Sequence, residues 1–271
     1  MTGVRPAVVA GSFYPGAPTV LQADVHAYVS DAATRRPEGV VPPKAVIVPH
    51  AGYVYSGAVA GAAYARLAAG RDTIRRVVLF GPTHRVPVRG LALPTARAFA
   101  TPLGDIDVDR EAVAVAIALP CVCQSDAAHA FEHSLEVQLP FLQEVLAEFS
   151  IVPFAVGDAT PREVADVIRL LWGGPETLII VSSDLSHYRG YADARAIDRA
   201  TADSILALSP TLDHEQACGA TPINGLLLCA RERGMRPELL DLRNSGDTAG
   251  DKSRVVGYAS FAFAGGADGR E

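Results

Sequence analysis

The sequence has little positive charge, no long apolar run and few cysteines, and each of these shortages excludes a class of protein. Its 24 Lys and Arg residues are outnumbered by 30 Asp and Glu residues, which gives a formal net charge of −6. Because surfaces that bind nucleic acid need clustered basic residues, we expect no nucleic-acid partner. No apolar run approaches the roughly 20 residues that cross a bilayer, and no apolar segment follows a basic start as in a signal peptide. We therefore expect a cytoplasmic protein with no membrane partner.

The four cysteines do not form a zinc-binding motif at the sequence level. Cys121 and Cys123 are separated by a single residue, which is too close for the usual zinc knuckle, and Cys229 lies within an apolar helical run. The fourth, Cys218, stands apart from the others. We expect reduced, mostly buried thiols, as is usual in a cytoplasmic protein.

Apolar residues make up 49% of the sequence and gather in short runs rich in Val, Ile and Leu. Continuous apolar runs of this length are typical of strands that are covered on both faces. They predict strands at Lys44–Pro49, Arg76–Phe80, Ser150–Val156, Thr177–Val181, Glu238–Leu242 and Val255–Phe263. Helical spacing between them predicts helices over Thr19–Thr34, Tyr55–Ala69, Glu132–Phe149, Pro161–Trp172, Tyr191–Leu208 and Pro222–Arg233. The alternation predicts one α/β domain over residues 1–271, with a mainly parallel central sheet and helices on both faces.

Two of the predicted helices carry local signals of their own. Thr160 precedes Pro161 and stands three residues before Glu163, the pattern of an N-terminal capping box with proline in the first turn. Pro140 lies inside the predicted helix Glu132–Phe149 and is expected to kink it or to end its first segment.

Histidines follow three of the predicted strands at the point where each strand ends. His50 comes after the first strand, His84 after the second, and His187 after the fourth, with Asp184 three residues before His187. Because the carboxyl ends of parallel strands lie along one edge of a sheet, where ligands bind, we expect these side chains to share one pocket. Neutral imidazole suits iron, copper or zinc, and two histidines with one carboxylate form the metal site of non-haem Fe(II) oxygenases.

A second cluster, Glu132-His133-Ser134-Leu135-Glu136, begins the helix predicted from Glu132. His133 and Glu136 would share one helical face there. Two interpretations stay open: His133 acts as an acid/base or substrate ligand, or the segment is an exposed first turn whose carboxylates favour the helix dipole. Tyr53 and Ser56, which follow His50, are further candidates for the pocket wall.

Taken in order along the chain, these motifs resemble the Memo family, component B of the AmmeMemoRadiSam system. The resemblance covers nearly the whole chain and rests on Arg5-Pro6, Ala10-Gly11-Ser12-Phe13-Tyr14-Pro15, Pro49-His50-Ala51-Gly52-Tyr53, Tyr55-Ser56-Gly57, Gly81-Pro82-Thr83-His84, Glu132-His133-Ser134-Leu135-Glu136, Ser183-Asp184-Leu185-Ser186-His187-Tyr188 and Gly257-Tyr258-Ala259.

The resemblance implies a fold like that of the LigB-type class III extradiol dioxygenases, which are non-haem iron enzymes. It implies that His50 and His84 are metal ligands, that His187 is the base, that Asp184 lines the same pocket and that His133 lies near substrate. Fe(II) is the expected cofactor, with copper or zinc as alternatives. Radical-SAM and AMMECR-type proteins are the partners that the resemblance implies, and a small aromatic molecule or a peptide is the expected ligand.

One departure from the family pattern concerns the third metal ligand. Animal Memo proteins carry a pocket cysteine near the C-terminus, where this chain has Thr248 and no cysteine nearby. Asp247, Asp184, His187 or water then remain as candidates for the third ligand. Without a thiolate, a site of nitrogen and oxygen ligands is favoured over a Cu(I) site.

Three classes of function are compatible with these residues. The leading hypothesis is a metal-binding, dioxygenase-like protein with redox or oxygenase activity. The second is a non-catalytic module that binds a peptide or partner in the same pocket. The third is a zinc peptidase, because residues 129–133 match H-x-x-E-H; a serine hydrolase is disfavoured because the chain has no G-x-S-x-G motif.

Overall fold

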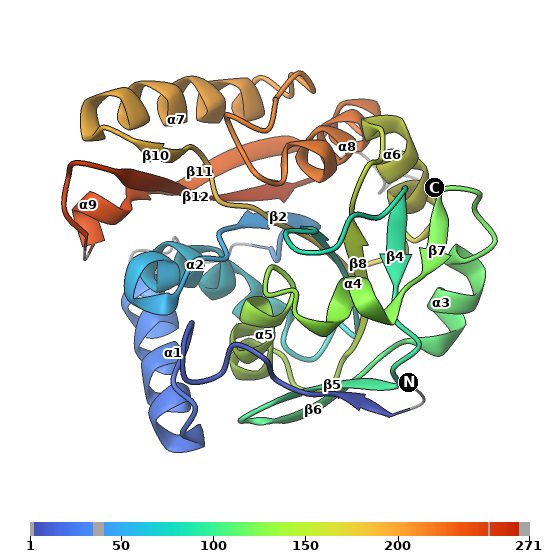
Figure 1. Ribbon diagram of the computed structural model, residues 1–271. Coiled ribbons are helices and arrows are strands. Elements are labelled where there is room, and N and C mark those ends of the chain that lie inside the picture. Colours follow the sequence, from blue (N-terminus) through green and yellow to red (C-terminus); the bar gives the residue numbers. More distant parts are fainter. Residues whose placement is uncertain (1–2, 35–40, 249, 266–271) are drawn as a thin grey trace.

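A mixed β-sheet with parallel strands at its centre organises the protein (Figure 1). The structure is a computed structural model, and it describes residues 3–34, 41–248 and 250–265. The four central strands run parallel to one another in the order β2 (Ala45–Val48), β9 (Thr177–Ser182), β3 (Arg76–Pro82) and β8 (Ser150–Val156). Nearly every residue in them is buried, as the continuous apolar runs predict.

Antiparallel strands border this parallel centre on both sides. On one side β12 (Val255–Ala264) pairs antiparallel with β2, and it is itself bordered by β11 (Arg236–Asn244) and β10 (His187–Arg189). On the other side β4 (Leu91–Leu93) pairs antiparallel with β8 and parallel with β7 (Val122–Gln124). A separate small sheet contains β1 (Val4–Arg5), β5 (Ala98–Thr101) and β6 (Gly104–Asp107).

Helices cover both faces of the large sheet, which confirms the predicted α/β class (Figure 1). One face carries α1 (Pro18–Ala33), α2 (Tyr53–Leu67) and α5 (Leu139–Val145), and the other carries α6 (Pro161–Leu170), α7 (Tyr191–Leu206) and α8 (Ala220–Glu232). Shorter helical segments are η1 (Ala68–Gly70), α3 (Arg110–Ala116), α4 (Asp126–Ala130), η2 (Glu136–Gln138) and α9 (Ser245–Thr248). Within the described ranges, no helix combines the length and apolar character needed to span a membrane.

The helix that follows His50 is held close to α1 by two glycines. A Cβ atom at Gly61 would lie 2.5 Å from the backbone oxygen of Tyr28, and one at Gly57 would lie 2.6 Å from the Tyr28 ring. Only glycine allows the two helices to approach this closely. Since α2 begins three residues after His50, this packing also positions the segment that carries the histidine.

The helix predicted over Glu132–Phe149 is wrong in its first part. Residues 132 and 133 are not helical, η2 covers Glu136–Gln138, and the α-helix starts only at Leu139 with Pro140 in its first turn. His133 and Glu136 therefore do not share a helical face. The physical reason is that the Glu132 carboxylate accepts hydrogen bonds from the backbone N–H groups of residues 133 and 134, an alternative to helical bonding.

The N-terminal signal of α6 is confirmed in full. The Thr160 side chain accepts a hydrogen bond from Glu163 N, and the Glu163 carboxylate accepts one from Thr160 N, with Pro161 in the first turn. Such reciprocal bonds satisfy two backbone donors that a helix start otherwise leaves unpaired.

Candidate metal centre

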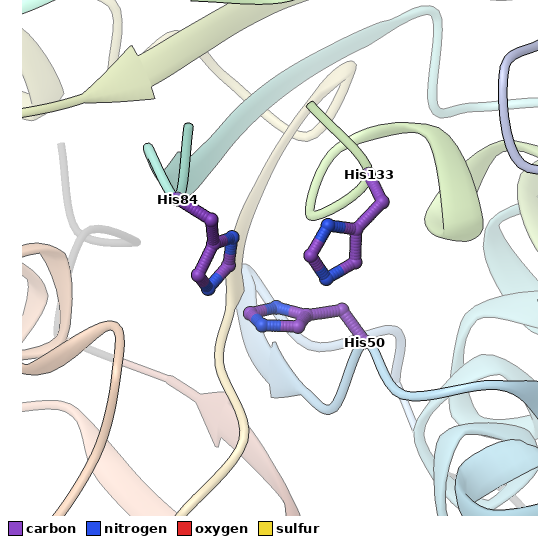
Figure 2. A group of neighbouring side chains, drawn as sticks. All are labelled: His50, His84 and His133. Atoms are coloured by element: carbon purple, nitrogen blue, oxygen red, sulfur yellow. The ribbon is translucent and has the colours of Figure 1, made fainter. Parts of the chain in front are cut away.

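Three histidines from distant parts of the sequence meet at the carboxyl edge of the parallel strands (Figure 2). His50 follows β2, His84 follows β3, and His133 lies in the loop before η2. One ring nitrogen from each lies within 4.8 Å of the others, and the group is the one in the described part of the chain that could hold a metal ion. The rings face one another across a common centre, with centroids 4.6 to 5.4 Å apart.

The Glu132 carboxylate orients two of these rings. Its Oε1 lies 2.9 Å from Nδ1 of His84 and 3.4 Å from Nδ1 of His133, and its Oε2 accepts a hydrogen bond from His84 N at 2.6 Å. Burial raises the pKa of Glu132, but the hydrogen bonds from His84 and from the backbone outweigh it and bring the pKa down to about 2. The hydrogen bond from the ionised carboxylate requires an N–H at Nδ1 of His84, so in the neutral His84 ring Nε2 is the free electron-pair donor.

The third ring, His50, is oriented by a chain of neutral hydrogen bonds. Its Nδ1 lies 2.9 Å from Ser182 Oγ, which donates its own proton to Ser134 O at 2.5 Å. Gln138 Nε2 also donates to Ser182 Oγ, while Tyr64 Oη donates to Gln138 Oε1 and so fixes the direction of the amide. Because the serine proton is already used, His50 Nδ1 must be the donor, and His50 Nε2 is left unprotonated.

Two of the three rings, His50 and His133, have a lowered pKa and are neutral at physiological pH. Burial, with a contribution from His84, lowers the pKa of His50 to about 3. Burial, with a contribution from His50, lowers the pKa of His133 to about 4. Metal ions bind neutral imidazole, so these two rings are in the form that coordination requires.

Asp184 and His187 lie beside the three-histidine group but are not part of it. Asp184 Oδ1 accepts a hydrogen bond from His50 N at 2.7 Å, and its Oδ2 lies 4.0 Å from His50 Nε2. Burial raises the pKa of Asp184 above its ordinary value. His187 begins β10, and its Nδ1 lies 2.8 Å from Leu185 O. A carbonyl at Nδ1 requires an N–H there, so in the neutral ring Nε2 is the acceptor.

A groove of about 710 Å³ opens on the site. His84 and His187 lie in its wall, together with the exposed Tyr188, whose backbone has a φ of +58°. Such a conformation is uncommon for a bulky residue and costs on the order of 1–3 kcal/mol, and strained residues of this kind cluster at binding and catalytic sites. The groove is large enough to admit a small molecule or an extended side chain to the histidines.

Glu136 has a role that the sequence did not predict. It is fully buried and accepts hydrogen bonds from Val8 N, Val9 N and Tyr14 Oη, and it forms an ion pair with Arg5 at 2.7 Å. These contacts fasten the segment between residues 5 and 14 beside the centre. Phe13 of that segment packs on the ring of His133, with centroids 4.7 Å apart. Glu136 thus supports the site through residues 5–14 and is not among the residues that line the groove.

The remaining candidate residues support the site from greater distance or lie away from it. Tyr53 is buried and donates to Val137 O, and Ser56 donates to Ala51 O. Asp247 accepts from Tyr191 Oη and from Asn244 N, and Thr248 donates to Ser245 O. Among the described residues that line the groove, neither Asp247 nor Thr248 is present.

The peptidase motif does not assemble in this structure. His129 is buried in α4 and its Nε2 lies 2.9 Å from Ala92 O, whereas His133 lies beyond the end of that helix. His129 is absent from the metal-binding group found among the described residues. In the H-x-x-E-H pattern both histidines would bind the metal.

Cys218 belongs to the site although no local sequence signal predicts it. Its Sγ lies 3.3 Å from His50 Nε2, the nitrogen that the hydrogen-bond network leaves free. Burial raises the pKa of the Cys218 thiol to about 12, so without a metal it is a neutral S–H donor. The residue stands alone in a loop before α8, 168 residues from its histidine partner, and only the folded chain brings the two together.

The chain is thus an α/β protein with a groove and a candidate metal centre at the carboxyl edge of its parallel strands, and comparison with known proteins shows its family. The family model of Memo-like proteins matches residues 5–262. A MEMO1 family protein of Archaeoglobus fulgidus is 37% identical over 270 residues, covering 94% of this chain and 97% of that protein. MEMO1 family proteins of Sulfolobus acidocaldarius and Aquifex aeolicus are 34% and 33% identical, each covering 96% of this chain and 99% of the relative. The chain belongs to the Memo-like protein family.

A solved structure also resembles this fold. The crystal structure of an uncharacterized protein, JW3007 of Escherichia coli K12, aligns with a TM-score of 0.50 at 14% identity, covering 81% of this chain and 99% of that one. At this identity the likeness concerns the fold alone.

Proposed function

We propose that this protein binds a first-row transition metal through His50, His84 and His133 and uses the adjoining groove as a dioxygenase-like redox site. The observation that carries the proposal is the convergence of three ring nitrogens within 4.8 Å, two of them oriented by the Glu132 carboxylate. A carboxylate that holds the far nitrogen of a histidine is a recurrent feature of metal sites.

The donor set fits the metals that imidazole prefers, which are iron, copper and zinc. Fe(II) is the first expectation where the remaining ligands are oxygens, and the Asp184 carboxylate stands 4.0 Å from His50. A bound Fe(II) ion would supply Lewis-acid and one-electron chemistry at the groove. Three histidine ligands leave coordination positions open, as catalytic sites require.

The chain's own residues provide acid–base chemistry around this centre. His187 lines the groove with its Nδ1 bonded to Leu185 O, so Nε2 of the neutral ring is the atom that would accept a proton from a substrate bound beside His84. Asp184 holds the backbone of His50 and keeps that ligand in position. Partner proteins of the radical-SAM and AMMECR types belong to the same proposal, and they rest on the family membership.

Metal analysis of anaerobically purified protein tests the proposal. We expect about one metal ion per chain in the wild type and background levels in His50→Ala and His133→Ala, while His26→Ala, which changes an exposed histidine bonded to Glu144, keeps its metal. Equal trace metal in all four proteins would overturn the proposal.

The same protein preparations distinguish the enzyme hypothesis from the hypothesis of a non-catalytic binding module. Oxygen uptake with aromatic substrates, lost in His187→Ala but with metal retained, supports the dioxygenase-like function. Peptide binding that survives complete metal removal, with no oxygen uptake, would instead assign the groove to recognition alone.

A further inference from the structure

A second cavity, separate from the groove beside the histidines, lies between α7 and the edge strand β11. It has a volume of about 470 Å³. Helix α7 packs on β11 there, and α9 follows the end of the strand (Figure 1). None of the described residues that line this cavity also lines the groove. A ligand bound between α7 and β11 would therefore occupy a site distinct from the candidate metal centre.

Three arginines from two elements line this cavity. Arg195 and Arg199 lie one turn apart on α7, and Arg243 lies on β11. Within the described ranges neither arginine of α7 forms an ion pair, and the Arg195 guanidinium lies 5.7 Å from the centre of the Tyr191 ring. Arg243 pairs at 2.9 Å with Asp241, which is not part of the cavity wall. Guanidinium groups gathered in this way attract anions and bind phosphate or carboxylate oxygens through paired N–H groups.

A buried amide adds a hydrogen-bond donor to the same wall. Asn244 ends β11, is 1% exposed and lines the cavity. Gly246 N donates to Asn244 Oδ1 at 3.0 Å, which fixes the orientation of the amide. Asn244 Nδ2 donates to no described residue and is not sealed inside the protein. Because buried polar groups are normally paired, this N–H₂ group points to a ligand with acceptor oxygens.

The two carboxylates of the cavity wall are held by donors of the protein itself. Asp247 accepts hydrogen bonds from Tyr191 Oη and from Asn244 N. Asp198 Oδ1 accepts one from Ser186 N at 3.0 Å. Three guanidinium groups against two carboxylates leave the wall positive, although the whole chain has a formal net charge of −6. The wall therefore favours an anionic ligand over a cation.

We propose that this cavity binds a small phosphate-bearing molecule, whose phosphate is held by the three arginines and by Asn244 Nδ2. A phosphate group accepts hydrogen bonds from several donors at once and carries about −1.5 to −2 charges at pH 7. At about 470 Å³ the cavity is in the range of small-molecule sites, so it has room for an organic group attached to the phosphate. This inference does not depend on the proposed metal function.

Isothermal titration of the full-length protein in a phosphate-free buffer tests the proposal with two probes, inorganic phosphate and glycerol 2-phosphate. We expect saturable binding of one molecule per chain in the wild type. Arg199→Gln and Asn244→Asp are each expected to weaken binding by about 10-fold or more, because each removes a donor to a charged ligand. Arg199→Gln changes an exposed side chain, and Asn244→Asp keeps the acceptor for Gly246 N, so both variants are expected to fold. Arg162→Gln, at an exposed arginine of α6 outside the cavity, is the matched control and binds like the wild type.

The two probes also distinguish the sources of the phosphate. Tighter binding of glycerol 2-phosphate assigns the rest of the cavity to an organic group, and inorganic phosphate that binds as well or better assigns the site to the free anion. No saturable binding of either probe in the wild type would overturn the proposal. Equal weakening in Arg162→Gln and Arg199→Gln, or wild-type affinity in both cavity variants, would overturn it as well. Binding is expected to persist in His50→Ala, which separates this test from that of the metal site.

Discussion

Four hydrogen-bond donors and a second imidazole surround the Glu132 carboxylate. The donors are Nδ1 and N of His84 and the backbone N–H groups of His133 and Ser134. The side chain is 2% exposed, so its charge is stabilised by these groups and not by water. The carboxylate orients the His84 ring by a hydrogen bond to Nδ1 and lies 3.4 Å from Nδ1 of His133, so it contacts both imidazoles.

Glu132→Gln is expected to weaken metal binding by about 10–100-fold, the usual loss when a group that orients ligands is removed. The amide oxygen can still accept from the His84 ring, but an NH₂ group in the place of Oε2 cannot accept from His84 N, and the negative charge beside both imidazoles is lost. Isothermal titration with zinc measures the change. Glu144→Gln, at a carboxylate that contacts the exposed His26, serves as the control and should bind zinc like the wild type. Unchanged affinity in Glu132→Gln would contradict the role assigned to the carboxylate.

Asp198 gives a pH-dependent prediction outside the metal site. It is buried on α7 and its Oδ1 accepts a hydrogen bond from Ser186 N. Burial raises the pKa of Asp198 from its ordinary value of 3.8 to about 6. In the folded state it therefore binds a proton more tightly than in the unfolded state, so its contribution to stability falls as pH rises from about 4 to about 6.

Asp198→Asn removes this titration because the amide stays neutral. The Tm difference, variant minus wild type, is therefore expected to be more positive at pH 7.5 than at pH 4.5, whatever its absolute value. Thermal unfolding of both proteins across this range measures it. A difference that is constant or that falls with rising pH would show that the burial of this carboxylate does not govern the titration.

At the residue scale the sequence predicted those site residues that a strand positions directly. His50 and His84 follow apolar runs, and the geometry of parallel strands explains why they meet. Cys218 and the orienting role of Glu132 could not be predicted in the same way, because their partners lie 168 and 48 residues away and no periodicity links them. His133 was predicted as an acid/base or substrate ligand. Its position in the metal-binding group depends on the conformation of the loop before η2, which no sequence pattern predicts.

At the scale of elements, the N-terminal segment behaves as a part of the site. Arg5 is buried, and its guanidinium donates to the backbone oxygens of His129 and Glu132 as well as to the Glu136 carboxylate. It also packs on the ring of Phe99 at 4.9 Å. One side chain thereby joins β1, the end of α4 and the loop of His133.

Arg5→Met is expected to destabilise the fold by about 3–5 kcal/mol, because it leaves the buried Glu136 without its counter-charge. Arg75→Met, which removes an exposed pair with Glu148, is expected to cost less than about 1 kcal/mol. Urea unfolding measures both. Similar losses in the two variants would mean that the buried pair contributes no more than a surface pair, and the double variant Arg5→Met/Glu136→Gln is expected to recover part of the loss.

The longer helices and strands were predictable because each carries apolar residues in one regular pattern, either at helical spacing or as a continuous run. The strand Ser150–Val156 was predicted to the residue, and α6 began at its capping signal. The short strands β4 to β7 were missed, since three or four residues hold too little pattern. The start of the helix predicted at Glu132 failed because the Glu132 carboxylate accepts from the backbone N–H groups of residues 133 and 134 and also from His84 N, information that local propensity does not contain.

At the scale of the whole molecule, a bound metal ion is expected to raise the free energy of unfolding, because its three histidine ligands come from distant segments of the chain. At a free zinc concentration 100 times its dissociation constant, binding adds about 2.7 kcal/mol to the free energy of unfolding. For a protein of this size that corresponds to roughly 5–10 °C in Tm. Differential scanning calorimetry with and without zinc measures the shift. A variant with His50, His84 and His133 all replaced by Ala should show no shift, and an equal shift in it would place zinc elsewhere.

The position of β2 in the sheet has a consequence for synthesis. This apolar strand pairs only with β9 and β12 in the described structure, and both are translated later. At about 5–20 residues per second, roughly 7–27 s pass between emergence of Val48 and of Ser182. During that interval the nascent chain carries an unpaired Ala45–Val48 segment, a template for intermolecular pairing. The strand that presents the first histidine is therefore also the segment most in need of chaperone protection on the ribosome.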